Sequence, residues 1–192
     1  MEPCRLSATD LACRRGERLL FRGLSLRLDA GAAVQVAGPN GTGKSSLIRI
    51  LAGLLRPYAG AVEREGDIGL LDERPALDGH QPLSQALSFW RRIDGGGNAA
   101  VERLGLEPLL DLPARYLSTG QRKRAALARL LSQRAPIWLL DEPLNGLDVH
   151  AVALCEALVA EHCAGGGITV VASHQPFTLP GMSRMVLAEF AT

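Results

Sequence analysis

One short segment constrains the fold of this chain more than any other. It reads Gly38-Pro39-Asn40-Gly41-Thr42-Gly43-Lys44-Ser45 and fits the phosphate-loop pattern G-x-x-x-x-G-K-[ST]. The residues before it, Ala33–Ala37, are apolar apart from Gln35, as in a strand that is covered on both faces. Apolar side chains then recur at helical spacing over Ile48–Leu55, and this pattern stops at Arg56-Pro57. A strand, a glycine-rich loop and a helix in this order open a nucleotide-binding α/β fold.

The residue types in this loop suit a bound triphosphate. Its glycines allow successive backbone N–H groups to point at phosphate oxygens, and the helix that follows adds its positive N-terminal end. We expect Lys44 to hold the β- and γ-phosphates, Ser45 to ligate Mg²⁺ and Ser46 to make a further phosphate contact. A chance match to the pattern occurs in on the order of one in a hundred chains of this length. The loop predicts ATP binding, but GTPases, small-molecule kinases and helicases share it.

Two carboxylates follow the apolar stretch Ile137–Leu140, namely Asp141 and Glu142. At the carboxyl end of a strand beside the phosphate loop, Asp141 is placed to hold Mg²⁺. Glu142, one residue further on, is placed to orient or deprotonate an attacking water. The ordinary alternative is an acidic pair that opens a surface loop, with a prior of about one in ten after such a strand and loop.

The rest of the chain predicts one α/β domain over residues 1–192. Alternating apolar residues at 6–13, 19–21 and 24–28 indicate an antiparallel β element near the N-terminus. Further strands are expected at 61–63, 67–71, 137–141, 168–172 and 185–188, and helices at 121–131 and 149–162. The fold class that results is a P-loop NTPase with a mainly parallel core sheet.

Residues from about 72 to 117 differ in character from the rest. They contain Pro75, Pro82, Pro108, Pro113 and the run Gly95-Gly96-Gly97, set between short helical patterns at 83–92 and 99–104. Prolines and glycines at this density interrupt regular strands. We therefore expect a small helical subdomain inserted into the domain.

Charge and hydropathy exclude several classes of partner. Lys and Arg number 21 and Asp and Glu 20, a net charge of +1, whereas a nucleic-acid binder usually carries a basic excess. The cluster Arg122-Lys123-Arg124 is expected on a helix surface. No apolar run approaches the roughly 18 residues that span a bilayer, and the first residues lack a secretory pattern. The four cysteines show no metal-ligand spacing and are expected to be reduced thiols.

A second motif decides between the phosphate-loop classes. Leu117-Ser118-Thr119-Gly120-Gln121, with the helical pattern after it, resembles the signature motif of ABC ATPases and stands about 20 residues before Asp141, as in that family. Ser118 as a plain N-cap and Gly120 as a plain turn residue are the alternatives. In that family two copies pair head to tail. The resemblance therefore implies an ATP-dependent homodimer in which Ser118, Gly120 and Gln121 contact the γ-phosphate held by the other copy.

Two later segments extend the resemblance. Asn145-Gly146-Leu147-Asp148 is similar to the family's D-loop, which crosses the dimer interface. His174 stands just past the strand expected at 168–172, where ABC ATPases carry a switch histidine that contacts the γ-phosphate. A lone histidine after a strand is otherwise a surface or structural residue. The three other histidines, His80, His150 and His162, are taken as structural.

Two departures from the family pattern stand out. A glutamine is expected near the end of the strand at 67–71, as a Mg²⁺ ligand and sensor of the membrane partner, but Glu73 occupies that position and Gln81 lies further on. The aromatic residue that stacks on adenine is also absent around Arg14–Arg15. The guanidinium of Arg15 is a candidate substitute, whereas Phe21 is expected in the core.

Three segments resemble one particular group of ABC ATPases. Val34-Gln35-Val36, the run Trp138–Pro143 and Ser173-His174-Gln175-Pro176 are similar to the ATP-binding subunits of the bacterial heme exporters that act in cytochrome c maturation. This implies an ATP-hydrolysing enzyme with Lys44, Glu142 and His174 in catalysis. It also implies integral membrane subunits as partners and a peripheral position on the cytoplasmic face of the bacterial inner membrane.

Other functions remain open at this point. A soluble ABC ATPase of an assembly system, such as iron–sulfur cluster assembly, would carry the same motifs. A regulatory nucleotide-binding module without meaningful hydrolysis would explain the two departures. A kinase or GTPase is disfavoured, because the chain has no Asn-Lys-x-Asp guanine motif and neither class explains Leu117–Gln121.

Overall fold

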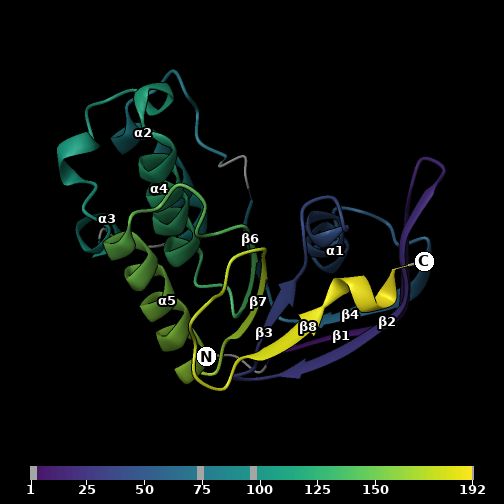
Figure 1. Ribbon diagram of the computed structural model, residues 1–192. Helices are drawn as coiled ribbons and strands as arrows, with labels where there is room; N and C mark the ends of the chain where they lie inside the picture. The colour runs from purple at the N-terminus through teal and green to yellow at the C-terminus, as the bar shows by residue number, and fades with distance from the viewer. Residues whose placement is uncertain (1–3, 73–75, 96–98, 192) are drawn as a thin grey trace.

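A five-stranded parallel sheet forms the centre of the protein, in the order β5-β6-β7-β3-β8. The computed structural model describes residues 4–72, 76–95 and 99–191 and is shown in Figure 1. Across the sheet the strands are β5 (Ile68–Leu71), β6 (Ile137–Asp141), β7 (Ile168–Ser173), β3 (Ala33–Ala37) and β8 (Ser183–Val186). Every residue of β3, β6 and β7 is buried, as their mainly apolar runs predicted for strands covered on both faces. The expected α/β class is confirmed.

A second, antiparallel sheet has the order β2-β1-β4. Its strands are β1 (Arg5–Arg15), β2 (Arg18–Asp29) and β4 (Ala59–Glu65). The two stretches expected at 19–21 and 24–28 belong to one strand. Gly23, with φ of +69°, lies inside this strand, and the register between β1 and β2 shifts at three points. These irregularities interrupt the alternation without ending the pairing.

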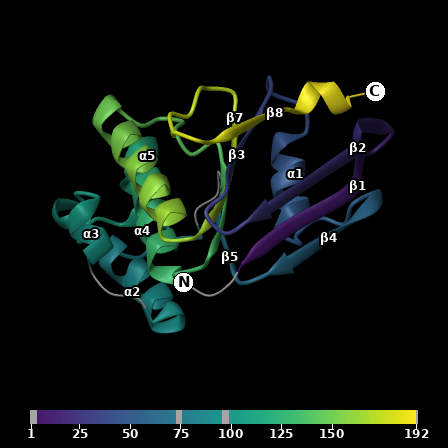
Figure 2. The same ribbon diagram turned by 90° about the horizontal axis from the view of Figure 1, so that it is seen from below.

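Helix α1 (Lys44–Leu51) follows the phosphate loop and lies between the two sheets, as Figure 2 shows. Its buried Leu47, Ile48, Ile50 and Leu51 join one core cluster with both sheets. The helix ends earlier than its apolar pattern predicted, because Gly53 adopts φ of +78° just beyond it and such a left-handed glycine ends helices. Leu54, which the pattern placed on the helix, is 66% exposed.

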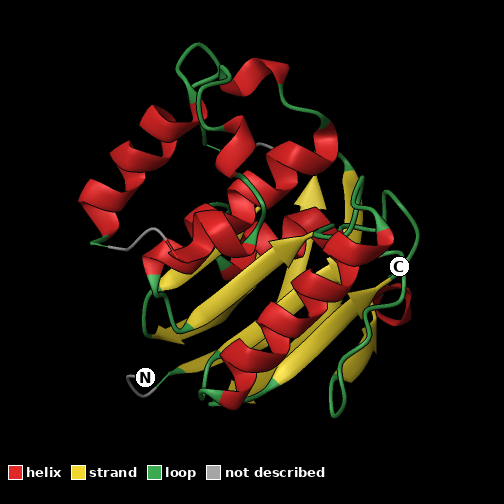
Figure 3. Ribbon diagram, turned by 90° about the vertical axis from the view of Figure 1, so that its left-hand side faces the viewer, coloured by secondary structure: helices red, strands yellow, loops and turns green. Residues whose placement is uncertain are grey.

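The opposite face of the parallel sheet is covered by α4 (Thr119–Gln133) and α5 (Val149–Ala164), so helices flank the strands on both sides (Figure 3). Between β5 and α4 the chain forms α2 (Leu83–Asp94), α3 (Ala99–Arg103) and the 3₁₀ turns η1 (Glu107–Leu109) and η2 (Ala114–Tyr116). Leucines from this region pack in the same core cluster as α4. That residues 72–117 form a subdomain of their own stays a prediction.

The last strand differs from its expected position near 185–188. It is β8, over Ser183–Val186, and a 3₁₀ turn, η3 (Leu187–Phe190), follows it. Within the described residues β8 pairs with β3 alone, and the last paired residue of β3 is Ala37. Beyond that point β3 turns into the phosphate loop, so β8 has no strand to pair with, and the buried Leu187 lies in the turn instead.

One side chain joins the antiparallel sheet to the carboxyl end of α1. Arg64 on β4 donates from Nε to the carbonyl oxygen of Leu51 at 2.6 Å and from Nη2 to that of Ile50 at 2.7 Å. These carbonyls lie in the last turn of the helix, where backbone partners are incomplete, and that of Ile50 also accepts from the N–H of Gly53 at 3.0 Å. A guanidinium there also offsets the negative end of the helix dipole. Arg64 therefore fixes the far end of the helix that carries the phosphate loop.

Arg64→Met should lower the free energy of unfolding by about 1–2 kcal/mol, because it removes two hydrogen bonds from a charged donor at a helix end. Urea denaturation measures the change. Arg22→Met, at an exposed position on β2 of the same sheet, is the matched control and should stay within about 0.5 kcal/mol of the parent chain. Equal losses in the two variants would contradict the capping role.

Candidate active site

The phosphate loop, residues 38–43, connects the carboxyl end of β3 to α1. Since β3 pairs with β7 and β7 with β6, all in parallel, the residues that follow these strands meet at one edge of the sheet. Gly43 shows why this turn requires glycine. It has φ of +105°, and a Cβ there would lie 3.3 Å from side-chain atoms of Leu20 and Phe21.

Lys44, the first residue of α1, is 5% exposed and points back into its own loop. Its Nζ donates to the carbonyl oxygens of Gly38 at 2.8 Å and Pro39 at 3.2 Å. A third oxygen neighbour is Glu142 Oε1, at 3.2 Å. The ammonium, which has three donors, is thus surrounded by loop carbonyls and one carboxylate.

Glu142 is 6% exposed and lies directly after β6. Its φ of +47° is unusual for a residue with a side chain, and such strain is found mainly at functional sites. The contact with Lys44 is an ion pair without hydrogen-bond alignment, since Glu142 Oε1 has no hydrogen-bond partner within the described residues. A buried carboxylate oxygen of this kind is able to accept a proton from a water molecule.

His174 lies on the loop after β7, with its side chain 37% exposed. Its Nδ1 is 2.8 Å from Glu142 Oε2. Because an ionised carboxylate only accepts hydrogen bonds, this contact assigns the ring proton to Nδ1. The structure thus brings Lys44, Glu142 and His174 together, from three separate segments of the chain.

The two predicted Mg²⁺ ligands lie on neighbouring segments of this edge. Asp141 is the last residue of β6 and is 4% exposed, and Ser45 lines a cavity of about 360 Å³ beside the phosphate loop. Ser46 also lines that cavity. Burial raises the pKa of the Cys13 thiol on β1, and the nearby Ser46 hydroxyl acts against that rise. The phosphate contact expected of Ser46 stays a prediction.

Leu20 and Asn145 also line this cavity, and the sequence had placed neither of them there. Its lining comprises Leu20, Asn40, Gly41, Gly43, Lys44, Ser45, Ser46, Glu142 and Asn145. Leu20, half-buried on β2, supplies the apolar wall. Only its strand position, next to the predicted core residue Phe21, gave a signal for it. Phe21 itself is fully buried, as expected.

A neighbouring cavity of about 310 Å³ shares Glu142 and Asn145 and extends to the start of α4. Lys123 lines it and is 8% exposed, and Arg124 donates to the carbonyl oxygen of Leu104 at 2.9 Å. The prediction that Arg122-Lys123-Arg124 lies on a helix surface is wrong for Lys123, which is buried, whereas Arg122 and Arg124 are partly exposed. The helical region between β5 and α4 contacts Arg124, which the periodicity alone did not reveal.

Ser118 and Gln121 form a capping box at the start of α4. The backbone N–H of Gln121 donates to Ser118 Oγ at 3.2 Å, and the N–H of Ser118 donates to Gln121 Oε1 at 2.8 Å. Gly120 lies against the segment predicted as the D-loop, because a Cβ on Gly120 would be 2.6 Å from the carbonyl oxygen of Gly146. Within one chain, Ser118 is thus an N-cap and Gly120 permits a close backbone contact.

Glu73 lies outside the described residues, and Gln81 is exposed in the turn before α2, where its carbonyl oxygen accepts from Ala114. Arg14 donates to the carbonyl oxygen of Gly16 and lies 5.7 Å from the ring centre of Tyr58. Arg15 is exposed.

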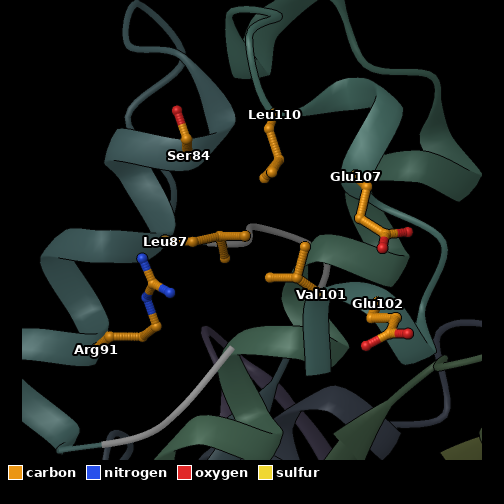
Figure 4. A pocket seen from close by; sticks show the side chains of 7 residues that line it. All are labelled: Ser84, Leu87, Arg91, Val101, Glu102, Glu107 and Leu110. Atoms are coloured by element: carbon orange, nitrogen blue, oxygen red, sulfur yellow. The ribbon is translucent and has the colours of Figure 1, made fainter. Parts of the chain in front are cut away.

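A separate cavity of about 320 Å³ lies between α2, α3 and η1 (Figure 4). Leu87, Val101 and Leu110 point into it, and polar side chains surround them. None of the residues that line it also lines the cavity beside the phosphate loop, so it forms no part of the candidate active site.

Comparison with known proteins agrees with this geometry. A family model described as ABC transporter matches residues 21–145. A relative from Novosphingobium aromaticivorans, named cytochrome c biogenesis ATP-binding export protein CcmA, is 61% identical over 99% of both chains. A relative of the same name from Sphingopyxis alaskensis is 50% identical over 97% of this chain and 98% of its own.

Solved structures show the same fold. An ABC transporter ATP-binding protein from Pyrococcus furiosus superposes with a TM-score of 0.83 at 21% identity, over 98% of this chain and all of that one. A metal-chelate type ABC transporter in an inward-facing conformation gives a TM-score of 0.79 at 24% identity, over 97% of this chain and 79% of that one.

Lys44→Met should lower the free energy of unfolding by about 3 kcal/mol, because it leaves the buried Glu142 carboxylate without its cation. Chemical denaturation of the nucleotide-free chain measures the loss. Combining Lys44→Met with Glu142→Gln removes that uncompensated charge and should restore more than half of the stability. Losses that simply add in the double variant would show that the two side chains do not interact.

Proposed function

Because the chain belongs to the ABC transporter family, we propose that it is the ATP-hydrolysing subunit of an exporter that serves cytochrome c biogenesis and handles heme. The observation that carries this is the cluster of Lys44, Glu142 and His174 at the phosphate loop. The printed name of the close relatives supports the cytochrome c pathway. Heme as the cargo rests on the resemblance of the sequence to heme exporter subunits.

In the proposed reaction, the backbone N–H groups of residues 38–43 and the ammonium of Lys44 hold the β- and γ-phosphates of ATP. Lys44 exchanges its loop carbonyls for phosphate oxygens, which are stronger acceptors because they are charged. Glu142 accepts a proton from the water that attacks the γ-phosphate. His174 holds Glu142 through Nδ1, and its Nε2 contacts the γ-phosphate, to which it donates when both ring nitrogens carry a proton.

Ser45 and Asp141 would hold Mg²⁺ through a hydroxyl and a carboxylate oxygen. Among residues 4–72, 76–95 and 99–191, no three His, Cys, Asp or Glu side chains are grouped as metal ligands. Two protein oxygens suit Mg²⁺, which keeps several waters and takes further ligands from nucleotide phosphates. When bound, the ion offsets negative charge on those phosphates.

Two copies of the chain would pair head to tail around the nucleotide. Ser118 is exposed at the start of α4, a helix of 15 residues whose positive end favours an anion. In this arrangement Ser118, Gly120 and Gln121 of one copy contact the γ-phosphate held by the other. The D-loop, residues 145–148, then lies between the two sites.

Integral membrane subunits are the proposed partners. In the described part of the chain, no helix has the length and hydrophobicity needed to cross a bilayer, and the relatives are named as export proteins. We infer a single ABC ATPase domain that is peripheral on the cytoplasmic face of the bacterial inner membrane. It neither inserts into the bilayer nor binds nucleic acid.

Glu142→Gln should retain ATP affinity, lower turnover by at least about 100-fold and accumulate an ATP-bound dimer, because the amide cannot accept the proton from water. Turnover is measured in the complex purified from gently solubilised membranes, with Glu107→Gln, an exposed position, as control. Parent-like turnover of Glu142→Gln would remove Glu142 from its role. Purification without any integral membrane protein would favour the soluble assembly ATPase.

Ser118→Asp distinguishes the N-cap role of Ser118 from its proposed contact with the γ-phosphate of the other copy. Aspartate is as good an N-cap as serine, so the thermal midpoint should hold, whereas its charge facing the γ-phosphate should lower turnover by more than about tenfold. Mixing it with an equal amount of inactive Lys44→Met chains should restore about a quarter of the parent turnover, since half of the random pairs then contain one intact composite site out of two. No restoration on mixing would show that the two motifs do not act between copies.

A further inference from the structure

Gln35 is the one polar side chain in β3 and is 7% exposed. Its neighbours Val34 and Val36 belong to the hydrophobic core between the two sheets. A buried amide lowers stability unless its hydrogen-bonding groups are satisfied, and valine or leucine would fill such a position at lower cost. The chemistry of the strand alone therefore does not explain a glutamine here.

The amide of Gln35 is bonded to the loop that carries His174. Its Nε2 donates to the carbonyl oxygen of Gln175 at 2.7 Å. Ser173 Oγ donates to the same oxygen at 2.9 Å and accepts from the N–H of Gln175 at 3.0 Å. The residues on both sides of His174 are thus tied down, one of them by a side chain from β3.

The connection continues toward Glu142. Gln175 Nε2 lies 3.5 Å from Asn145 Oδ1, and the N–H of Asn145 donates to the carbonyl oxygen of Glu142 at 3.4 Å. β3 itself runs directly into the phosphate loop after Ala37. Gln35 therefore joins the strand that ends in the phosphate loop to the two segments that surround the Glu142 carboxylate.

We propose that Gln35 is a positioning residue, which holds the 173–175 loop so that His174 Nδ1 stays in contact with Glu142 Oε2. His174 is 37% exposed, so packing alone restrains it little, and the position of its backbone decides where the ring lies. Two donors on one carbonyl fix that backbone. The inference rests on the proposed function, because it assumes that His174 acts with Glu142.

Gln35→Met tests this with a side chain of similar size that cannot donate a hydrogen bond. In ¹⁵N-histidine NMR of the full chain, the His174 Nδ1 resonance, assigned by its loss in His174→Ala, should move toward that of an unbonded ring. In the membrane-purified complex, kcat should fall by about tenfold, because small misplacements of catalytic groups cost rate. KM for ATP should change less than about twofold, because the phosphate loop keeps its contacts.

Two further variants complete the test. Gln85→Met makes the same chemical change at an exposed position on α2 and should alter neither the resonance nor kcat. Ser173→Ala removes the second donor to the Gln175 carbonyl and should move the His174 resonance in the same direction as Gln35→Met. It keeps the inference testable if Gln35→Met fails to fold.

An unchanged His174 resonance in Gln35→Met, or in Ser173→Ala if that is the only folded variant, would overturn the inference. A lowered thermal midpoint with parent-like kcat would also overturn it, since Gln35 would then be purely structural. The NMR measurement needs no turnover, so the inference can fail while Glu142→Gln behaves as proposed. Conversely, parent-like turnover of Glu142→Gln would overturn the proposed function even when the His174 resonance moves.

Discussion

Parallel pairing of β6, β7 and β3 is the constraint on which the rest of the structure depends. Each strand ends at the same edge of the sheet and continues into a segment that carries chemistry: Glu142 after β6, His174 after β7 and the phosphate loop after β3. These groups are far apart in sequence, yet one register places them within hydrogen-bonding distance of each other. The burial of these strands, with helices on both faces, keeps that register from slipping.

The charges at this edge make it a poor place to maximise stability. An ammonium and a carboxylate are both removed from water, which costs free energy that their mutual attraction only partly offsets. Glu142 also keeps a backbone conformation that side chains disfavour. The surrounding apolar clusters and the Arg64 contact at the other end of α1 stabilise the fold enough to hold this arrangement.

Much of this was predictable from sequence because each motif consists of residues that are adjacent along the chain. The bounds of β3 and β6 were predicted correctly from their apolar runs, and so was the place of the glycine-rich loop between β3 and a helix. The end of α1 was not predicted correctly, because Gly53, in the left-handed region, ends the helix before its apolar spacing does. Burial of Lys123 and the contact between Gln35 and Gln175 depend on segments brought together only by the fold, and periodicity within one segment carries no information about them.

The backbone contact between Gly120 and Gly146 has a mechanical consequence. With a Cβ excluded at 2.6 Å, the backbone of Gly120 lies directly against that of Gly146, and the side chain of Thr119 packs beside this contact. A displacement of the first turn of α4 toward the sheet therefore also moves residues 145–148. Asn145, which lies beside the phosphate loop, moves with them. Force applied to the helical region would therefore reach the phosphate loop through the direct backbone contact between these two glycines.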